Sequence, residues 1–453
     1  MPQKTILIKN ADYIITFDKK ESILKNKSLL IEGKQIKKIG TKITSADYVI
    51  NAKDMIVIPG LINCHHHLFQ CGLRGMPKLQ NQKINKWINI VCKYAKKIDD
   101  KIMYYAALTN MAELLLYGCT TTTDMHYLFP KGNYGLIEST IQAAKDIGIR
   151  FHPYRGSMSL SKKNGQLFPD KIVESSEEIY SRSEKLIKTH HDPSRFSMLR
   201  VGIAPCTVFS SSASDFKNAV LLARKYNINL QTHLSESRFE DSYVISKYNK
   251  RPLEYLQSLG WIGPQVSFVH GINLTDKDIK ALRKSGSALI HCPISNARKP
   301  VGDIGIAPIT ELLKQKITVG VGTDGSAGND SSNVLEELRW ARTLQGARES
   351  STYLNPLTTL AMATKSGAKA LRWDNTIGSI ENDKAADIAL FNLRNNVEFA
   401  GANDPITALI SCQAKRAETV IVNGKIVVDK GLLTTFSEEY IINQFNSCIH
   451  NIL

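Results

Sequence analysis

Three consecutive histidines, His65, His66 and His67, follow a short apolar run in the stretch PGLINCHHHLFQCGLRG. Imidazole nitrogens are the commonest ligands of metal ions in proteins. If a strand runs into the triplet, its side chains alternate, so His65 and His67 point to one side and His66 to the other. The stretch therefore predicts an inward-facing pair, His65 and His67, with His66 packed behind it.

Two more histidines and an aspartate end other apolar segments: His233 in THLSES, His270 in VSFVHG and Asp324 in GVGTDG. A lone histidine at a strand end is more often a hydrogen-bonded polar residue than a ligand. Several such residues at strand ends favour a common site, because independent placement would scatter them. Two imidazoles on alternate residues, one more imidazole and a carboxylate form a ligand set that suits zinc or a similar divalent ion.

Glu236 stands three residues past His233. A carboxylate at that position can reach a water beside the metal without binding the ion itself; the alternative is a helix-capping or surface glutamate. Asp324 can serve both as ligand and as acceptor of the proton from the attacking water. A divalent ion lowers the pKa of a bound water from about 16 to about 7, so the set predicts hydrolytic chemistry at neutral pH.

The elements that position these residues alternate between strand and helix from about residue 56 onward. The candidate strands are MIVIPGLINCH, CTTTTDMH, IRFHPYRG, LRVGIAPC, INLQTHLSE, VSFVHG, SALIHCP and ITVGVGTDG, each followed by a helical pattern. Eight such units predict an α/β fold of the TIM type, a (β/α)₈ barrel, rather than an open doubly wound sheet. The active site of a barrel lies at the C-terminal ends of its strands, where the candidate residues fall.

Both ends of the chain show the alternation of β-strands, for example in TILIKNADYIITF and ETVIVNGKIVVDKG. The Asn423-Gly424 pair between two apolar runs is typical of a hairpin. We therefore expect residues 1–57 and 376–453 to form one small β-sandwich domain built from both termini, and residues 58–375 to form the barrel.

Composition bears on partners and location. The net charge of +16 comes from lysines and arginines spread along the chain, without a basic run or a nucleic-acid module. This predicts a basic solvated surface and no nucleic-acid partner.

The sequence lacks an apolar run of membrane-spanning length and a signal peptide, and its eight cysteines form no C-x-x-C pair. We expect a cytoplasmic protein with reduced thiols and no membrane association.

Competing motifs are incomplete. GVGTDG has the form G-x-G-x-x-G, but a helical segment stands where a dinucleotide-binding fold needs a second strand ending in an acidic residue. The sequence contains no H-E-x-x-H, and Pro205-Cys206 lacks the second cysteine of the zinc nucleobase deaminases. These absences leave the histidine and aspartate set as the main chemical signal.

Several motifs together resemble the amidohydrolase superfamily: PGLINCHHH, THLSE, FVHG, HCPISN and VGTDGSAGNDSSN occur in its order and spacing. The closest resemblance is to its deaminase and chlorohydrolase branch. More narrowly, HHHLFQ, GCTTTTDMHYLFP, YRGSMSLS and VGTDGSAGNDSSN are similar to the 8-oxoguanine and isoxanthopterin deaminases.

The resemblance implies roles for individual residues. It implies metal ligands at His65, His67, His233 and Asp324. It makes Glu236 the proton shuttle. It makes His270 a substrate-binding residue that orients the hydroxide or holds the tetrahedral intermediate. Members with two metals carry a modified lysine on strand four; LRVGIAPC offers none near its end. We therefore expect one divalent ion, Zn²⁺ with Fe²⁺ as the alternative.

Two further residues bear on the substrate. Gln70, three residues past His67, can donate to or accept from a heterocycle, and Arg155 offers a planar fork of donors to a carbonyl. The alternatives are a loop-stabilising glutamine and an arginine in a structural ion pair. If both reach the pocket, the substrate is a flat heterocycle with more than one carbonyl and an exocyclic amine.

The predicted function is that of a metal-dependent aminohydrolase that deaminates an oxidised purine or pterin, such as 8-oxoguanine or isoxanthopterin, and releases ammonia. The alternatives are a triazine amino- or chlorohydrolase of the hydroxyatrazine type and a deaminase of S-adenosylhomocysteine or another nucleoside. We expect a small-molecule heterocyclic substrate and a homo-oligomer, a dimer, as the assembly.

Overall fold

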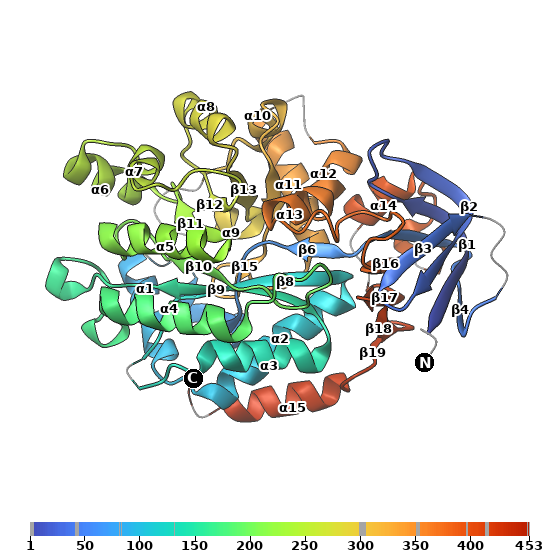
Figure 1. Ribbon diagram of the computed structural model, residues 1–453, viewed down its shortest axis with the longest axis horizontal. Helices are drawn as coiled ribbons and strands as arrows, with labels where there is room; N and C mark the ends of the chain where they lie inside the picture. The colour runs from blue at the N-terminus through green and yellow to red at the C-terminus, as the bar shows by residue number, and fades with distance from the viewer. Residues whose placement is uncertain are drawn as a thin grey trace.

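Eight parallel strands form the central sheet of the computed structural model (Figure 1). The structure describes residues 4–40, 45–80, 82, 84–130, 132–298, 305–349, 354–395, 397–412, 416–450 and 452. The strands follow one another in chain order: β6 (Leu61–Asn63), β8 (Cys119–His126), β9 (Arg150–Ser157), β10 (Gly202–Pro205), β11 (Leu230–Leu234), β12 (Val266–His270), β13 (Ala288–His291) and β14 (Val319–Val321). All eight predicted barrel strands are present.

The last strand returns to the first. The Cys64 N–H donates to the Val321 carbonyl at 2.9 Å, and β7 (His66–His67) pairs in parallel with β15 (Asp324–Gly325). Asp324 lies opposite His66 in this register. The sheet is thereby closed, and the predicted (β/α)₈ barrel is confirmed.

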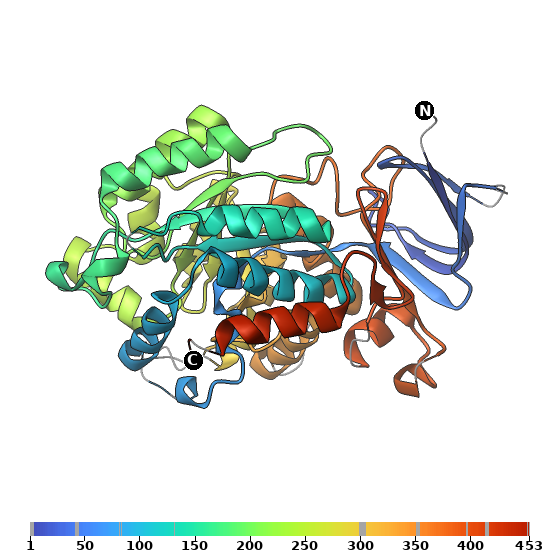
Figure 2. The same ribbon diagram turned by 90° about the horizontal axis from the view of Figure 1, so that it is seen from below.

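Helices surround the barrel (Figures 1 and 2). They are α1 (Ile84–Ala95), α2 (Asp100–Leu116), α3 (Leu136–Ile147), α4 (Ser176–His190), α5 (Ala213–Tyr226), α6 (Arg238–Tyr248), α7 (Pro252–Ser258), α8 (Asp276–Ser285), α9 (Pro293–Arg298), α10 (Ile309–Lys314), α11 (Val334–Glu349), α12 (Pro356–Met362) and α13 (Lys365–Ala370). Local sequence sets several starts: the Asp99 carboxylate accepts from the Ile102 N–H at 2.8 Å, and Ser212 with Asp215 forms a capping box. Within the described ranges, no helix combines the length and apolar character needed to cross a bilayer.

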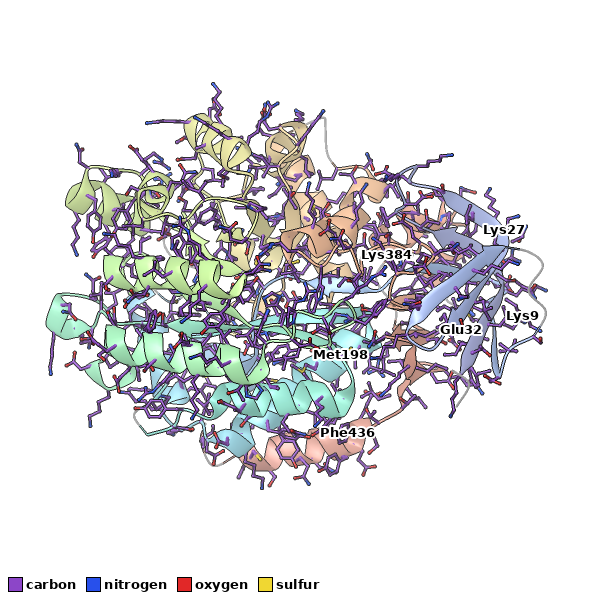
Figure 3. The ribbon with its side chains drawn as sticks, viewed as in Figure 1. Lys9, Lys27, Glu32, Met198, Lys384 and Phe436 are labelled. Atoms are coloured by element: carbon purple, nitrogen blue, oxygen red, sulfur yellow. The ribbon has the colours of Figure 1, made fainter. Side chains whose placement is uncertain are left out.

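Strands from both ends of the chain form a second, mixed sheet. Its members are β1 (Thr5–Ile15), β2 (Ile23–Glu32), β3 (Gln35–Gly40), β4 (Tyr48–Asn51), β5 (Met55–Pro59), β16 (Ile388–Asn392), β17 (Thr419–Val422), β18 (Lys425–Asp429) and β19 (Leu432–Leu433). The two halves meet at β5, which pairs in parallel with β1 and antiparallel with β16. A separate apolar core draws residues from both halves, among them Ile14 and Ile388. Figure 3 shows Lys9 and Lys27 on this sheet, at the end of the molecule away from the barrel.

The segment MIVIPGLINCH, predicted as one strand, is divided at Gly60. Residues before Gly60 belong to the mixed sheet and residues after it to the barrel. A Cβ at position 60 would lie 2.1 Å from Thr120 Oγ1, so only glycine fits this junction. The Gly60 N–H donates to the Asp387 carbonyl at 2.8 Å, which joins the two halves of the mixed sheet at the entrance to the barrel.

The C-terminal segment 376–453 contributes more than sheet strands. It also contains α14 (Pro405–Ser411) and α15 (Glu438–Ile449), and α15 runs along the barrel side of the molecule (Figure 2). Phe445 of α15 packs with Ala106 of α2 and with Cys71. The Tyr105 and Tyr440 hydroxyls lie 3.2 Å apart. The chain end therefore covers the helices that support the loop after His67.

Candidate active site

Three buried imidazoles converge at the C-terminal ends of β6, β7 and β11. One ligand atom from each of His65, His67 and His233 lies within 4.8 Å of the others. The ring centroids of His65 and His67 are 4.6 Å apart, and those of His65 and His233 are 5.1 Å apart. His66 points away, with its Nε2 3.0 Å from Ser332 Oγ. The structure thus places the triplet with the alternation that its sequence predicts.

The outer nitrogens of the three rings fix their orientation. In each ring the Nδ1–H donates to an oxygen 2.8 Å away: Gln231 Oε1 for His65, Met125 O for His67 and Cys206 O for His233. A carbonyl or amide oxygen only accepts, so the Nδ1 carries the proton and the Nε2 presents its lone pair. Burial lowers the pKa of His233 to about 3, with His65 and His270 adding to the effect, so this imidazole is neutral at pH 7. Neutral imidazoles with oriented lone pairs are metal ligands, and these residues fit a divalent ion.

Asp324 adds a carboxylate to the cluster. Its Oδ1 lies 3.3 Å from His67 Nε2 and 3.6 Å from His65 Nε2. The Ser295 hydroxyl donates to its Oδ2, and the Gly325 N–H donates to its Oδ1 at 2.8 Å. These two hydrogen bonds hold the carboxylate in place. Together with the imidazoles of His65, His67 and His233, the carboxylate forms a set of nitrogen and oxygen ligands typical of zinc.

Glu236 and His270 lie beside this cluster. The Glu236 carboxylate is 3.5 Å from His270 Nε2, and His270 Nδ1 donates to Asn296 Oδ1 at 2.8 Å. The His270 and His233 rings are stacked with centroids 5.3 Å apart. The structure therefore brings together every predicted metal-binding and catalytic side chain.

The backbone at this end of the barrel is strained. Ser235, His270 and Asp324 adopt φ values of 48°, 78° and 59°, in the left-handed region that non-glycine residues rarely occupy. Such conformations cost about 1–3 kcal/mol each and cluster at functional sites. Here they lie just after β11, at the end of β12 and in β15, close to the points from which His233, His270 and Asp324 reach the cluster.

A cavity opens beside the cluster. Aromatic and apolar side chains form most of its walls, and His67, His233 and Glu236 form its polar end. The walls that the sequence had not indicated are Trp87, Ile88, Tyr127, Phe168, Cys206, Thr207 and Phe209. Tyr127, Cys206 and Thr207 directly follow barrel strands, which is a signal that could have found them. Trp87 and Phe168 lie in excursions between a strand and its helix, and nothing in their local pattern distinguishes them.

The two predicted substrate contacts have different surroundings. Gln70 lines the cavity, and its Oε1 accepts from the Ala327 N–H at 3.1 Å. The Arg155 guanidinium is buried and binds both carboxylate oxygens of Glu174, at 2.6 and 2.7 Å. It also lies 4.4 Å above the Phe129 ring. Arg155 is outside the residues that line the cavity, so its geometry is that of the structural ion pair, the alternative that the sequence left open.

A closed (β/α)₈ barrel with histidines and an aspartate gathered at the C-terminal ends of its strands defines a metal-dependent hydrolase of the barrel class. Residues 56–427 match the amidohydrolase family, and the chain belongs to that family.

Individual relatives narrow the comparison. The chain is 36% identical to an 8-oxoguanine deaminase of Pseudomonas aeruginosa over 83% of this chain and 82% of the relative. It is 32% identical to a hydroxydechloroatrazine ethylaminohydrolase of a Pseudomonas species, over 84% and 80% of the two chains. Among solved structures, an atrazine chlorohydrolase of Arthrobacter aurescens in complex with zinc superposes with a TM-score of 0.94 at 31% identity, covering 98% of this chain and 100% of that one.

Proposed function

We propose that this protein hydrolytically deaminates a flat amino-substituted heterocycle of the oxidised purine or pterin type, with 8-oxoguanine or isoxanthopterin as its substrate. The observation that carries the proposal is the position of Glu236. Its carboxylate reaches into an aromatic-walled cavity beside the three histidines and Asp324, where it can serve a ring held against them. The 36% identity to an 8-oxoguanine deaminase supports the same substrate class.

The ion expected at His65, His67, His233 and Asp324 supplies hydroxide at neutral pH, because it lowers the pKa of water to about 7. Glu236 takes a proton from the attacking water and gives it to the adjacent ring nitrogen, while the oxygen adds to the ring carbon that bears the amine. Asp324 accepts the second water proton from the added hydroxyl, and this proton passes to the exocyclic nitrogen. The C–N bond then breaks, and ammonia leaves as the ring carbonyl forms. Glu236 is 17% exposed, which suits a group that exchanges protons with the cavity.

His270 lies beside Glu236 and supports the same step. Its Nδ1–H is committed to Asn296, so its Nε2 is the nitrogen that faces the reacting centre. An imidazole fixed in this way presents a lone pair at Nε2, which can accept a hydrogen bond from the attacking water or from the hydroxyl of the tetrahedral intermediate and so orient its oxygen. Preorganised groups of this kind stabilise a transition state because they need no rearrangement during the reaction.

The cavity walls indicate how the ring is held. Phe168 and Phe209 have nearly parallel rings, with an interplanar angle of 9° and centroids 6.4 Å apart. Planar faces of this kind suit a flat heterocycle through offset stacking and apolar contact. The amide of Gln70 already uses its oxygen for Ala327, so its N–H groups are the donors for a ring carbonyl. We therefore assign Gln70 to the substrate carbonyl.

Hydrolysis of a substituted triazine is the second candidate. The 32% identity to the ethylaminohydrolase and the zinc-bound chlorohydrolase structure favour it, because both relatives are named for the hydrolysis of atrazine or of an atrazine derivative. A deaminase of S-adenosylhomocysteine type is a third candidate, supported by a relative that is 29% identical over 99% of this chain.

A substrate screen distinguishes these candidates. Zinc-loaded protein would be incubated with 8-oxoguanine, isoxanthopterin, guanine, a hydroxylated triazine amine and S-adenosylhomocysteine, and ammonia or alkylamine release would be measured. The proposal expects the highest kcat/KM for 8-oxoguanine or isoxanthopterin. Faster turnover of the triazine or the nucleoside would transfer the assignment to that candidate.

We also propose a cytoplasmic location and a homodimer. All eight cysteines are free thiols in the structure, which suits a reducing compartment. Exposed Tyr440 and Ile442 on α15, with 42% and 52% of their surface accessible, support a contact between chains. Light scattering of the purified protein measures the assembly directly, and a monomeric mass at micromolar concentration contradicts the dimer.

A further inference from the structure

A second polar cavity lies at the opposite end of the barrel, where strands begin. It has a volume of about 160 Å³ and is lined by His152 of β9, by His191 and Arg200 before β10, by Asn227 and Asn229 before β11, and by Arg372 after α13. A single water needs about 10–15 Å³, so the space admits a larger ligand. Among the lining residues that the structure describes, none is acidic.

His152 faces this cavity without a hydrogen bond. His152 is 1% exposed, and both of its ring nitrogens lack a hydrogen-bond partner among the described residues. The ring stacks on Tyr154 with centroids 4.6 Å apart and lies edge-on to Trp373. Buried polar atoms almost always have a partner, so an imidazole held in this way indicates a ligand or water that enters from the cavity.

Arg200 brings a positive charge that few groups compensate. Its Nη1 donates to the Arg372 carbonyl at 3.0 Å, while its Nε is buried and has no partner among the described residues. Asp192 is the carboxylate that acts on Arg200, and it already accepts from the Ser194 N–H at 2.9 Å. Burial, with help from Arg150 and Arg372, lowers the pKa of Arg200 to about 10.

Among the described residues, the carboxylates of Asp192 and Asp387 already have other partners. Arg150 is paired with Asp387, through bonds of 2.8 and 3.0 Å, so that carboxylate is occupied. The Arg372 guanidinium is oriented by Asn227, whose Oδ1 accepts from Nη2 at 2.8 Å. Two guanidinium groups and an unpartnered imidazole therefore border one small cavity, and they approach it from three segments of the chain.

We propose that this cavity binds a small tetrahedral oxyanion with the chemistry of phosphate, held by Arg200, Arg372 and His152. Guanidinium groups offer planar sets of donors that match phosphate oxygens, and hydrogen bonds to a charged acceptor are stronger than neutral ones. Donors that arrive from three segments suit a tetrahedral anion better than a flat carboxylate, which one guanidinium can satisfy. The site is remote from the catalytic cluster because it lies at the N-terminal ends of the strands.

The test uses full-length, zinc-loaded protein and inorganic phosphate. Calorimetric titration should show saturable binding with one phosphate per chain at this site, and Arg200→Gln should weaken it at least tenfold. Phosphate should also raise the melting temperature of the wild type, because a ligand that binds only the folded state stabilises it. Arg283→Gln is the matched control, since Arg283 is a surface arginine bonded to Gln315; its phosphate affinity should equal that of the wild type.

Further arms keep the proposal falsifiable. Arg372→Gln provides a second variant if Arg200→Gln does not fold, and a wild-type crystal soaked in phosphate shows the position of the anion without any substitution. Adenosine monophosphate distinguishes the sources: tighter binding than inorganic phosphate, lost in the same variants, identifies an organic phosphate as the occupant. Phosphate affinity that is unchanged in both variants, or a soaked crystal with no density beside His152, overturns the proposal.

Discussion

The Nε2 atoms of His65 and His233 lie 3.3 Å apart, although the Nδ1 of each ring is already committed as a donor to a fixed oxygen. Two unprotonated nitrogens at this distance direct their lone pairs into the same space. That arrangement is unfavourable without a positive charge between them, and a bound divalent ion supplies one. The hydrogen bonds at Nδ1 hold both rings so that their Nε2 lone pairs point at the position of the ion.

The first prediction concerns metal content. Elemental analysis should find one divalent ion per chain, and His65→Ala should lose it because a ligand is removed. His66→Ala is the matched control, since His66 points to Ser332 and away from the cluster; it should retain the metal. Two tightly bound ions per wild-type chain would contradict the single-metal prediction.

The second prediction assigns the proton transfers to Glu236. Glu236→Gln keeps the size of the side chain but removes its base, so turnover should fall roughly 10²–10⁴-fold. Zinc content should be unchanged, because Glu236 stands outside the ligand set. Single-turnover kinetics with the metal-loaded variant measures the loss. Near-normal activity would reassign the proton transfers to Asp324 or His270.

The third prediction tests the acceptor that orients His65. Gln231→Leu removes the oxygen 2.8 Å from His65 Nδ1, and zinc affinity should fall about 10–100-fold. Gln231→Glu keeps an acceptor and should retain most of the affinity. Gln265→Leu is a surface control. Competition with a chromogenic chelator gives the three affinities, and equal values for Gln231→Leu and the wild type would exclude this role.

The fourth prediction distinguishes the role of Gln70, a substrate contact, from that of Arg155, a structural ion pair. If Gln70 donates to the extra carbonyl, Gln70→Ala should narrow the preference for 8-oxoguanine over guanine by roughly twofold to thirteenfold, the equivalent of one hydrogen bond of about 0.5–1.5 kcal/mol. The ratio of the two kcat/KM values is the measurement. A ratio that does not move would remove Gln70 from the substrate site.

Arg155→Ala should act on stability instead. Among the described residues, it leaves the buried Glu174 carboxylate with Arg182, at 2.8 Å, as its remaining ionic partner. Breaking a buried pair costs about 3–5 kcal/mol, and the free energy of unfolding in urea should fall by that order. The substrate preference of the folded variant should stay at the wild-type ratio. A narrowed preference with unchanged stability would return Arg155 to the substrate site.

The fifth prediction concerns pH. Glu240 is 1% exposed, its Oε2 accepts from the Glu236 N–H at 3.1 Å, and burial raises its pKa from 4.5 to about 8. The folded state therefore holds a proton that the unfolded state loses above about pH 4.5. This group's contribution to stability is fully present below pH 4.5 and declines as pH rises towards 8, by at most about 1.4 kcal/mol per pH unit.

Glu240→Gln cannot ionise and should flatten that decline. Urea unfolding at pH 5, 6.5 and 8 measures the slope. Glu254→Gln, at an exposed glutamate on α7, should keep the wild-type slope. If the slopes of Glu240→Gln and the wild type coincide, Glu240 does not titrate in this range.

The sequence by itself determined the repeat of eight strand–helix units and the residues that end the strands. Periodicity reports which side chains face the core, and side-chain alternation separates His66 from His65 and His67 because it depends only on local backbone geometry. The motifs also predicted the family, since ligands at strand ends recur in a fixed order along the chain. For the same reason, Glu236 and His270 could be named before their 3.5 Å separation was known.

Only the tertiary structure decided which distant side chains meet. Arg155 and Glu174 are 19 residues apart, and their pairing depends on how the excursion after β9 folds back on the strand. Trp87 and Phe168 reach the cavity from two separate excursions, while Gly60 transfers the chain from one sheet to the other. Local pattern carries no record of such contacts, because they arise from packing between segments whose separation in sequence is variable and whose own periodicity is weak.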